Sequence, residues 1–146
     1  PYMDITRVGL ASYTLYPEAS TGLLIHPDLY KVGVDINPMT DARLMPQIGN
    51  FGGGTKYPPH ENFVNKLRGK LLLIHGMMED VVLVGATFRL VEALQKANKP
   101  FDMLVLPNVD HHGPLDYATR RSWDFMVTHL LGVEPPVDFD MNEVDG

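Results

Sequence analysis

The chain has 146 residues, the length of one ordinary domain, and 45% of them are apolar, so a packed core is expected rather than disorder. It contains no cysteine, which excludes disulfides, thiolate nucleophiles and cysteine-based zinc sites. A net charge of −6 argues against nucleic acid as a partner. No apolar run approaches the ~20 residues of a membrane span. The N-terminus also lacks the basic and apolar regions of a signal peptide, so we expect no membrane association and leave the localisation open.

Short apolar runs alternate with amphipathic segments along the chain. They predict strands at residues 5–11, 30–37, 70–76 and 101–106, and helices at residues 17–25, 61–67, 84–97 and 115–131. The run 70–76 is continuous and apolar, which is typical of a strand covered on both faces. In the third helix, Val84, Phe88, Val91 and Leu94 recur at helical spacing and predict the buried face. Alternating strands and helices predict an α/β fold with a parallel sheet of about four strands and flanking helices.

Two segments outside this pattern bear on function. Residues 52–54 are a glycine run, but the following Thr55-Lys56 is in the reverse order to a phosphate-binding loop and no apolar strand precedes it. We therefore expect a flexible turn there and no cofactor. Residues 133–146 carry five acidic residues and no basic one, so they are interpreted as an acidic C-terminal tail after a domain of residues 1–132.

Parallel sheets place their sites at the carboxyl ends of the strands, so the segments that follow the four strands meet at one edge. The loop after 70–76 supplies Glu79 and Asp80, and the loop after 101–106 supplies His111 and His112. A carboxylate at a neighbouring strand end can orient an imidazole, fix its tautomer and stabilise the imidazolium. The alternative is that both acids only complement the dipole of the helix that follows them.

A metal site that also uses Asp110 is a further interpretation of the same loops. Adjacent histidines in an extended loop point in opposite directions, so His111 and His112 rarely bind one ion, and we expect no metal. The remaining histidines are expected to be structural: His26, His60, His75 and His129.

Several segments together resemble one known family. They are residues 69–76 (GKLLLIHG), residues 90–102 (LVEALQKANKPFD), and residues 104–136, which contain Leu-Val-Leu-Pro-Asn and then His111. These segments resemble the C-terminal end of the prolyl oligopeptidase family of serine peptidases, with bacterial dipeptidyl peptidase IV-like enzymes as the nearest branch. The resemblance extends upstream through residues 26–34 to residues 7–9. It implies a partial α/β-hydrolase-like three-layer sandwich and a Ser/Asp/His triad that cleaves peptides, often after proline.

Carried over residue by residue, the family histidine falls on His111. The family acid falls on Glu79, which is one methylene longer than the usual aspartate, and Asp80 is next to it. The family's Gly-x-Ser-x-Gly elbow is matched by residues 12–16 (SYTLY), where Thr14 falls at or beside the serine position and both glycines are absent. Ser12 is the other hydroxyl of this segment.

Two hypotheses follow. The first is a serine-type hydrolase of peptides or small esters, with His111 as base, an acid from Glu79 or Asp80, and a nucleophile from Ser12 or Thr14. The second is a catalytically inactive α/β-hydrolase remnant that serves as an interaction or oligomerisation module. The altered elbow favours the second. An exposed strand at the N-terminal edge of the sheet would further predict a homo-oligomer.

Overall fold

The computed structural model describes residues 3–44 and 58–141, so the glycine run at 52–54 lies outside the described residues. Four parallel strands form one sheet in the order β1-β2-β3-β4. They are β1 (Val8–Tyr13), β2 (Tyr30–Ile36), β3 (Lys70–Gly76) and β4 (Asp102–Leu106). The helices are α1 (Glu18–Ile25), η1 (Ala42–Leu44), η3 (His60–Lys66), α2 (Val84–Lys96), α3 (Asp116–Met126) and η4 (Val127–Leu131).

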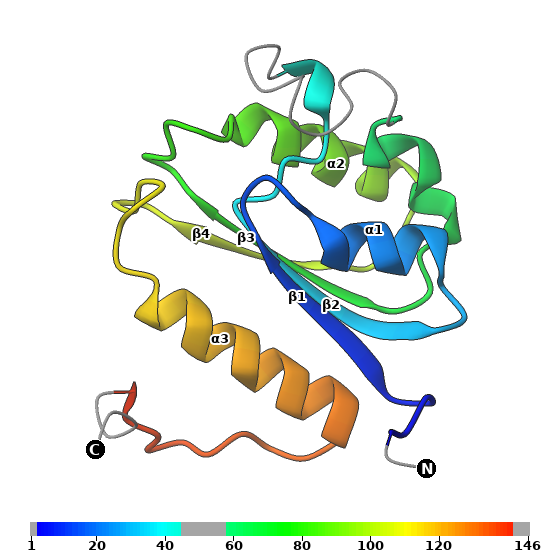
Figure 1. The fold of residues 1–146 in the computed structure, drawn as a ribbon, viewed down its shortest axis with the longest axis vertical. Coiled ribbons are helices and arrows are strands. Elements are labelled where there is room, and N and C mark those ends of the chain that lie inside the picture. The colour runs from blue at the N-terminus through cyan, green and yellow to red at the C-terminus, as the bar shows by residue number, and fades with distance from the viewer. Residues whose placement is uncertain (1–2, 45–57, 142–146) are drawn as a thin grey trace.

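The elements form three layers, with α1, η3 and α2 on one face of the sheet and α3 on the other (Figure 1). The alternation of side chains along β3 explains this arrangement, because successive residues of a strand point to opposite faces. Leu71 and Leu73 pack in the cluster that contains α1, η3 and α2, while Leu72 and Ile74 pack in the cluster that contains α3. The continuous apolar run is therefore covered on both faces, as predicted, and the predicted α/β sandwich is confirmed.

The first strand begins later than predicted, at Val8 rather than residue 5. Residues 4–7 instead form a turn, in which the Arg7 N–H donates to the Asp4 carbonyl and the Asp4 carboxylate accepts from Thr6 and Arg7. At its other end the strand continues through Tyr13, which pairs with Ile36 of β2. This shift puts residues 12 and 13 inside the sheet and leaves Thr14 as the first residue after it.

Two helices also differ from the prediction. The segment 60–66 is a 3-10 helix rather than an α-helix. In α2 the predicted stripe is partly wrong, because Phe88 is 43% exposed and the buried face consists of Ala86, Thr87, Leu90, Val91 and Leu94. The buried face includes Thr87 because its hydroxyl finds a partner inside, at 2.9 Å from His75 Nδ1.

The last helix ends as its sequence predicts. Gly132 adopts a left-handed φ of 69°, which is the usual way a glycine terminates a helix. The following segment returns along α3, where Arg120 donates to the main-chain carbonyls of Pro136 and Phe139. The Phe139 ring also packs edge-on against Trp123, with centroids 6.0 Å apart. Within the described ranges, no helix is both long and apolar enough to cross a membrane.

Candidate active site

Thr14 occupies a sharp turn between β1 and α1. Its φ is 64°, in the left-handed region that a β-branched residue rarely enters. Such a conformation costs of order 1–3 kcal/mol and persists only where the surroundings enforce it. Here the Thr14 N–H donates to the Ile36 carbonyl at 2.8 Å, and the Thr14 carbonyl accepts from Met39 N–H at 3.2 Å. Both ends of this residue are thus tied to the carboxyl end of β2.

Two glycines outside the turn allow α1 to approach the sheet closely. A Cβ on Gly22 of α1 would lie 2.4 Å from Leu10 Cδ1, and a Cβ on Gly33 of β2 would lie 2.6 Å from Leu23 Cδ1. The helix therefore packs tightly on β1 and β2 through these two glycines. Residues 12–16, which form the turn, contain no glycine themselves.

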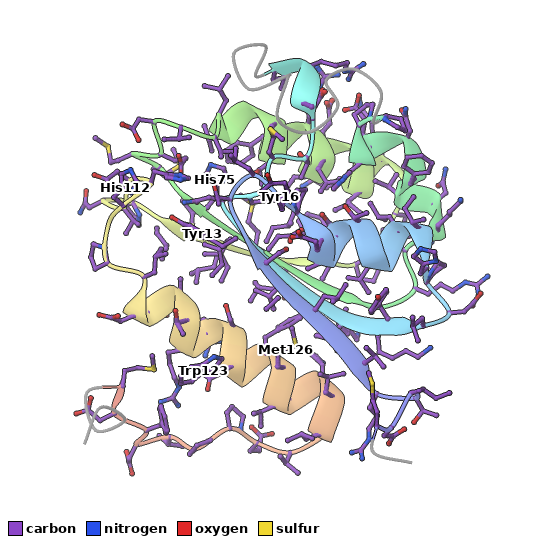
Figure 2. The ribbon with its side chains drawn as sticks, viewed as in Figure 1. Tyr13, Tyr16, His75, His112, Trp123 and Met126 are labelled. Carbon is purple, nitrogen blue, oxygen red and sulfur yellow. The ribbon has the colours of Figure 1, made fainter. Side chains whose placement is uncertain are left out.

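His111 comes from the loop after β4 and is nearly buried. Its main-chain carbonyl accepts the hydroxyl of Tyr13, and the two rings lie with centroids 5.6 Å apart. Burial raises the pKa of Tyr13, and the nearby Glu79 and Asp110 carboxylates add to the rise. The loop also contacts the end of β3, because Met78 N–H donates to the Val109 carbonyl at 3.1 Å. Figure 2 shows Tyr13, His75 and His112 at this same end of the sheet.

Glu79 lies in the loop after β3 with a fully buried side chain. Its carboxylate oxygens are 2.8 and 2.9 Å from His111 Nδ1. The N–H groups of Val81 and Val82 donate to Oε1, each at 2.8 Å. These two bonds fold the longer glutamate side chain back on its own loop, which is how the extra methylene is accommodated.

The other ring nitrogen of His111, Nε2, lies 3.2 Å from Thr14 Oγ1. Thr14, His111 and Glu79 therefore form one continuous chain of hydroxyl, imidazole and carboxylate. In this arrangement an imidazole can take the hydroxyl proton while the carboxylate holds its tautomer and stabilises the positive ring. In α/β hydrolases one oxyanion donor is the N–H of the residue after the nucleophile, and Leu15 is the residue that follows Thr14.

Three other residues singled out from the sequence lie outside the hydrogen-bonded series of Thr14, His111 and Glu79. The Ser12 hydroxyl donates to Asp35 and accepts the Ala19 N–H at 3.0 Å, so it is engaged below the turn rather than at His111. Asp80 is exposed, and its neighbour Glu79 makes the contact with the imidazole. His112 stacks edge-on against His111 at 5.1 Å between centroids without joining the chain.

Two residues of the site were missed by the sequence reasoning. Tyr13 ties β1 to the His111 loop, and nothing in the sequence marks a tyrosine for that contact. Asp35 is fully buried beneath the turn, and here a signal was available, since a carboxylate stands among the apolar residues of β2. His75 is structural as expected, with Nδ1 at the Thr87 hydroxyl and Nε2 3.3 Å from the Val82 carbonyl, and burial lowers its pKa.

The parallel sheet is covered on both faces, a strained turn follows β1, an acid follows β3 and a histidine follows β4. This combination defines the α/β-hydrolase class. Comparison with known proteins agrees. The sequence profile of the prolyl oligopeptidase family matches residues 19–132, which is most of the chain, and the chain belongs to that family. The matched range begins after Thr14, so it includes Glu79 and His111 but not the turn.

Individual relatives are named as peptidases. A candidate dipeptidyl aminopeptidase of Schizosaccharomyces pombe is 30% identical in an alignment 137 residues long, and the alignment covers 83% of this chain and 16% of that protein. The crystal structure of Porphyromonas gingivalis dipeptidyl peptidase 4 superposes with a TM-score of 0.74 at 26% identity and covers 89% of this chain. The acylaminoacyl peptidase of Pyrococcus horikoshii shares the fold, with a TM-score of 0.72 at 14% identity over 98% of this chain.

The chain spans only a small part of each of these proteins. It covers 20% of the Porphyromonas gingivalis structure and 27% of the Pyrococcus horikoshii structure.

Proposed function

We propose that this chain carries the nucleophile, base and acid of a serine-peptidase-like hydrolase site, in which Thr14 takes the place of serine. Thr14 Oγ1 attacks the carbonyl carbon of a peptide or small ester and passes its proton to His111 Nε2. Glu79 stabilises the resulting imidazolium, which returns the proton to the leaving amine or alcohol. Water, activated by the same imidazole, then releases the acyl group from Thr14.

The observation that supports this proposal is the unbroken chain from Thr14 to His111 to Glu79, with 3.2 Å and 2.8 Å between the paired atoms. Both distances are within hydrogen-bonding reach, the first between nucleophile and base and the second between base and acid. The left-handed φ of Thr14 adds to it, because a nucleophile elbow is a strained strand-to-helix turn. The peptidase names of the relatives make an N-terminal dipeptide the first substrate class to test.

The experiment compares wild type with Thr14→Ala, Thr14→Ser and Thr128→Ala on 4-nitrophenyl acetate and on dipeptide 4-nitroanilides. Thr14→Ala removes the nucleophile, so we expect kcat to fall by about 10³-fold or more. Thr14→Ser keeps the hydroxyl without the β-branch, so its activity should equal or exceed that of wild type. Thr128 is exposed on η4, and its replacement by alanine should change nothing.

A fluorophosphonate probe locates the nucleophile directly. Peptide mass spectrometry should place the adduct on residue 14 in wild type and in Thr14→Ser. An adduct on Ser12 would overturn the assignment of Thr14. No turnover and no adduct in folded protein would reject hydrolysis altogether. That result would favour the alternative, a catalytically inactive α/β-hydrolase remnant that serves as an interaction or oligomerisation module.

A further inference from the structure

A buried carboxylate lies directly beneath the Thr14 turn. Asp35 is 0% exposed and stands opposite Ser12 in the ladder between β1 and β2. The Ser12 hydroxyl donates to Asp35 Oδ1, and the Ser20 N–H donates to Oδ2 at 2.9 Å. Asp35 forms no ion pair with any residue in the ranges 3–44 and 58–141. Its partners are therefore neutral donors.

These contacts satisfy the first turn of α1 from the sheet. The N-cap residue of α1 is Pro17, which offers no side-chain acceptor, and no side-chain cap bond is made there. The N–H groups of a first helical turn lack partners within the helix. Ser12 Oγ accepts the N–H of Ala19 at 3.0 Å, and Asp35 accepts the N–H of Ser20. A carboxylate at this end of a helix also complements the helix dipole.

The same contacts fix both ends of the segment that carries Thr14. Ser12 is the residue two positions before Thr14, and Ala19 and Ser20 are where the chain enters α1. The Asp35 carboxylate accepts from Ser12 and Ser20, and the Ser12 hydroxyl accepts from Ala19. Asp35 is also the residue before Ile36, whose carbonyl accepts the Thr14 N–H. The position of Asp35 is thereby linked to the turn through the main chain as well.

We propose that Ser12 and Asp35 are positioning residues that hold the Thr14 turn in its left-handed conformation and keep the hydroxyl at His111. This inference rests on the proposed function and assigns Ser12 a role other than nucleophile. The pair restrains the turn through hydrogen bonds that join β1, β2 and the first turn of α1. Burial raises the pKa of Asp35, and the hydrogen bonds that it accepts from Ser12 and Ser20 oppose that rise.

The test uses Ser12→Ala and Asp35→Asn, with Ser122→Ala as the matched control. Ser122 is a buried serine of α3 whose hydroxyl donates to the Ala118 carbonyl at 2.7 Å, on the other face of the sheet. The first readout needs no activity. Amide hydrogen exchange, resolved by NMR, should be accelerated about tenfold or more at Thr14, Ala19 and Ser20 in both variants. Exchange at Leu73 in β3 reports global stability and should change far less.

The second readout is the hydrolysis of 4-nitrophenyl acetate. Ser12→Ala should lower kcat about tenfold and leave KM within about twofold, because a displaced hydroxyl reacts less while the surface that binds the ester is intact. Ser122→Ala should leave both constants unchanged. If Asp35→Asn does not fold, Ser12→Ala decides the matter alone.

The outcomes separate the two proposals. Unchanged exchange at Thr14 and Ala19 in folded Ser12→Ala, or a kcat equal to that of wild type, overturns the positioning role even if Thr14-dependent hydrolysis is present. Local acceleration in a protein without Thr14-dependent hydrolysis rejects the proposed function while showing that the pair holds the turn.

Discussion

At Thr14 a β-branched side chain holds a left-handed backbone conformation, with φ at 64°. A threonine hydroxyl is also restricted at χ1, since two heavy atoms on Cβ limit the rotamers available. In this chain the restriction is compatible with the site, because the hydroxyl lies 3.2 Å from His111 Nε2. The methyl group remains as bulk beside the attacking oxygen. We therefore expect Thr14 to react more slowly than a serine in the same position.

Glu79 provides the sharpest test of the His111 environment. Glu79→Gln replaces an acceptor of the His111 Nδ1 proton with an amide that can present a donor, so the imidazole tautomer needed at Thr14 becomes disfavoured. The buried carboxylate charge that stabilises the imidazolium is also lost. We expect kcat to fall by about 10²–10⁴-fold with KM little changed, measured by steady-state hydrolysis of a 4-nitrophenyl ester.

The matched control is Asp80→Asn, the neighbouring exposed carboxylate. Its activity should remain within about twofold of wild type, because the His111 ring contacts Glu79 rather than Asp80. Equal losses in the two variants would contradict the assignment of Glu79. They would show instead that the loop as a whole is sensitive to charge.

Part of this site could be predicted from residue types and spacing. A histidine and an acid after neighbouring strands implied an imidazole–carboxylate pair, and the family resemblance directed attention to His111 and Glu79. The same resemblance placed Thr14 at or beside the serine position and left Ser12 open as the alternative. The contact of Thr14 with His111 depends on the φ of Thr14 and on its hydrogen bonds to β2, which no sequence pattern encodes. Asp35 was detectable as a carboxylate among apolar strand residues, but its partners come from two other elements.

Helix α1 packs closely against the sheet at Gly22. A Cβ there would lie 2.4 Å from Leu10 Cδ1 and 2.9 Å from Tyr30 Cδ2. Gly22→Ala should cost about 1–3 kcal/mol through overpacking, and the helix propensity of alanine returns up to about 1 kcal/mol, so we expect a net destabilisation of up to about 2 kcal/mol. Gly85→Ala in α2 is the control, because a Cβ there meets nothing within 4 Å. It should be neutral or stabilising by up to about 1 kcal/mol. Urea unfolding followed by circular dichroism measures both.

His60 joins η3 to α1 and gives the fold a pH dependence. Its Nδ1 lies 3.0 Å from Ser20 Oγ and its Nε2 lies 3.1 Å from Thr21 Oγ1. Burial lowers the pKa of His60 from 6.5 to about 4, against an opposing effect of Asp41. Between pH 6.5 and about pH 4, the His60 ring is protonated in the unfolded chain and neutral in the folded chain. The stabilisation is therefore complete above pH 6.5 and is lost as the pH falls toward 4.

The measurement compares unfolding free energies of wild type and His60→Gln from pH 7 to pH 4. Wild type should lose up to about 3 kcal/mol more than the variant over this range, which corresponds to the lowered pKa. The variant lacks the titrating ring but keeps a side-chain amide that can bond a hydroxyl. Parallel curves for the two proteins would show that His60 is not the titrating group.

The elements were predictable to different degrees for a physical reason. β3 was located to the residue because a buried central strand is apolar throughout, and α2 was located because apolar residues recur at helical spacing along it. The beginning of β1 was misplaced because pairing with β2, rather than local propensity, determines which residues belong to the sheet. The buried face of α2 was partly misjudged because a polar Thr87 is buried where His75 offers it a partner.

For the whole molecule, the important feature is a sheet with open edges. β1 and β4 each have one neighbouring strand among the described residues. β4 begins with the charged Asp102, whereas β1 (VGLASY) contains no charged residue and no proline. Charged residues and proline are the features by which edge strands avoid pairing with other chains. The unprotected edge is therefore that of β1, which also leads into the Thr14 turn (Figure 1).

We expect a chain of these 146 residues to self-associate by pairing β1 edges, with a two-fold dimer as the first species. Ala11→Lys should oppose this association, because Ala11 is exposed in the middle of β1 and an ammonium group disfavours edge-to-edge contact. Light scattering across a concentration series should then shift from dimer toward monomer in the variant. Thr128→Lys, which adds the same charge at an exposed position on η4, should leave the dimer unchanged. A monomer at high concentration in wild type, or equal effects of the two lysines, would contradict association through β1.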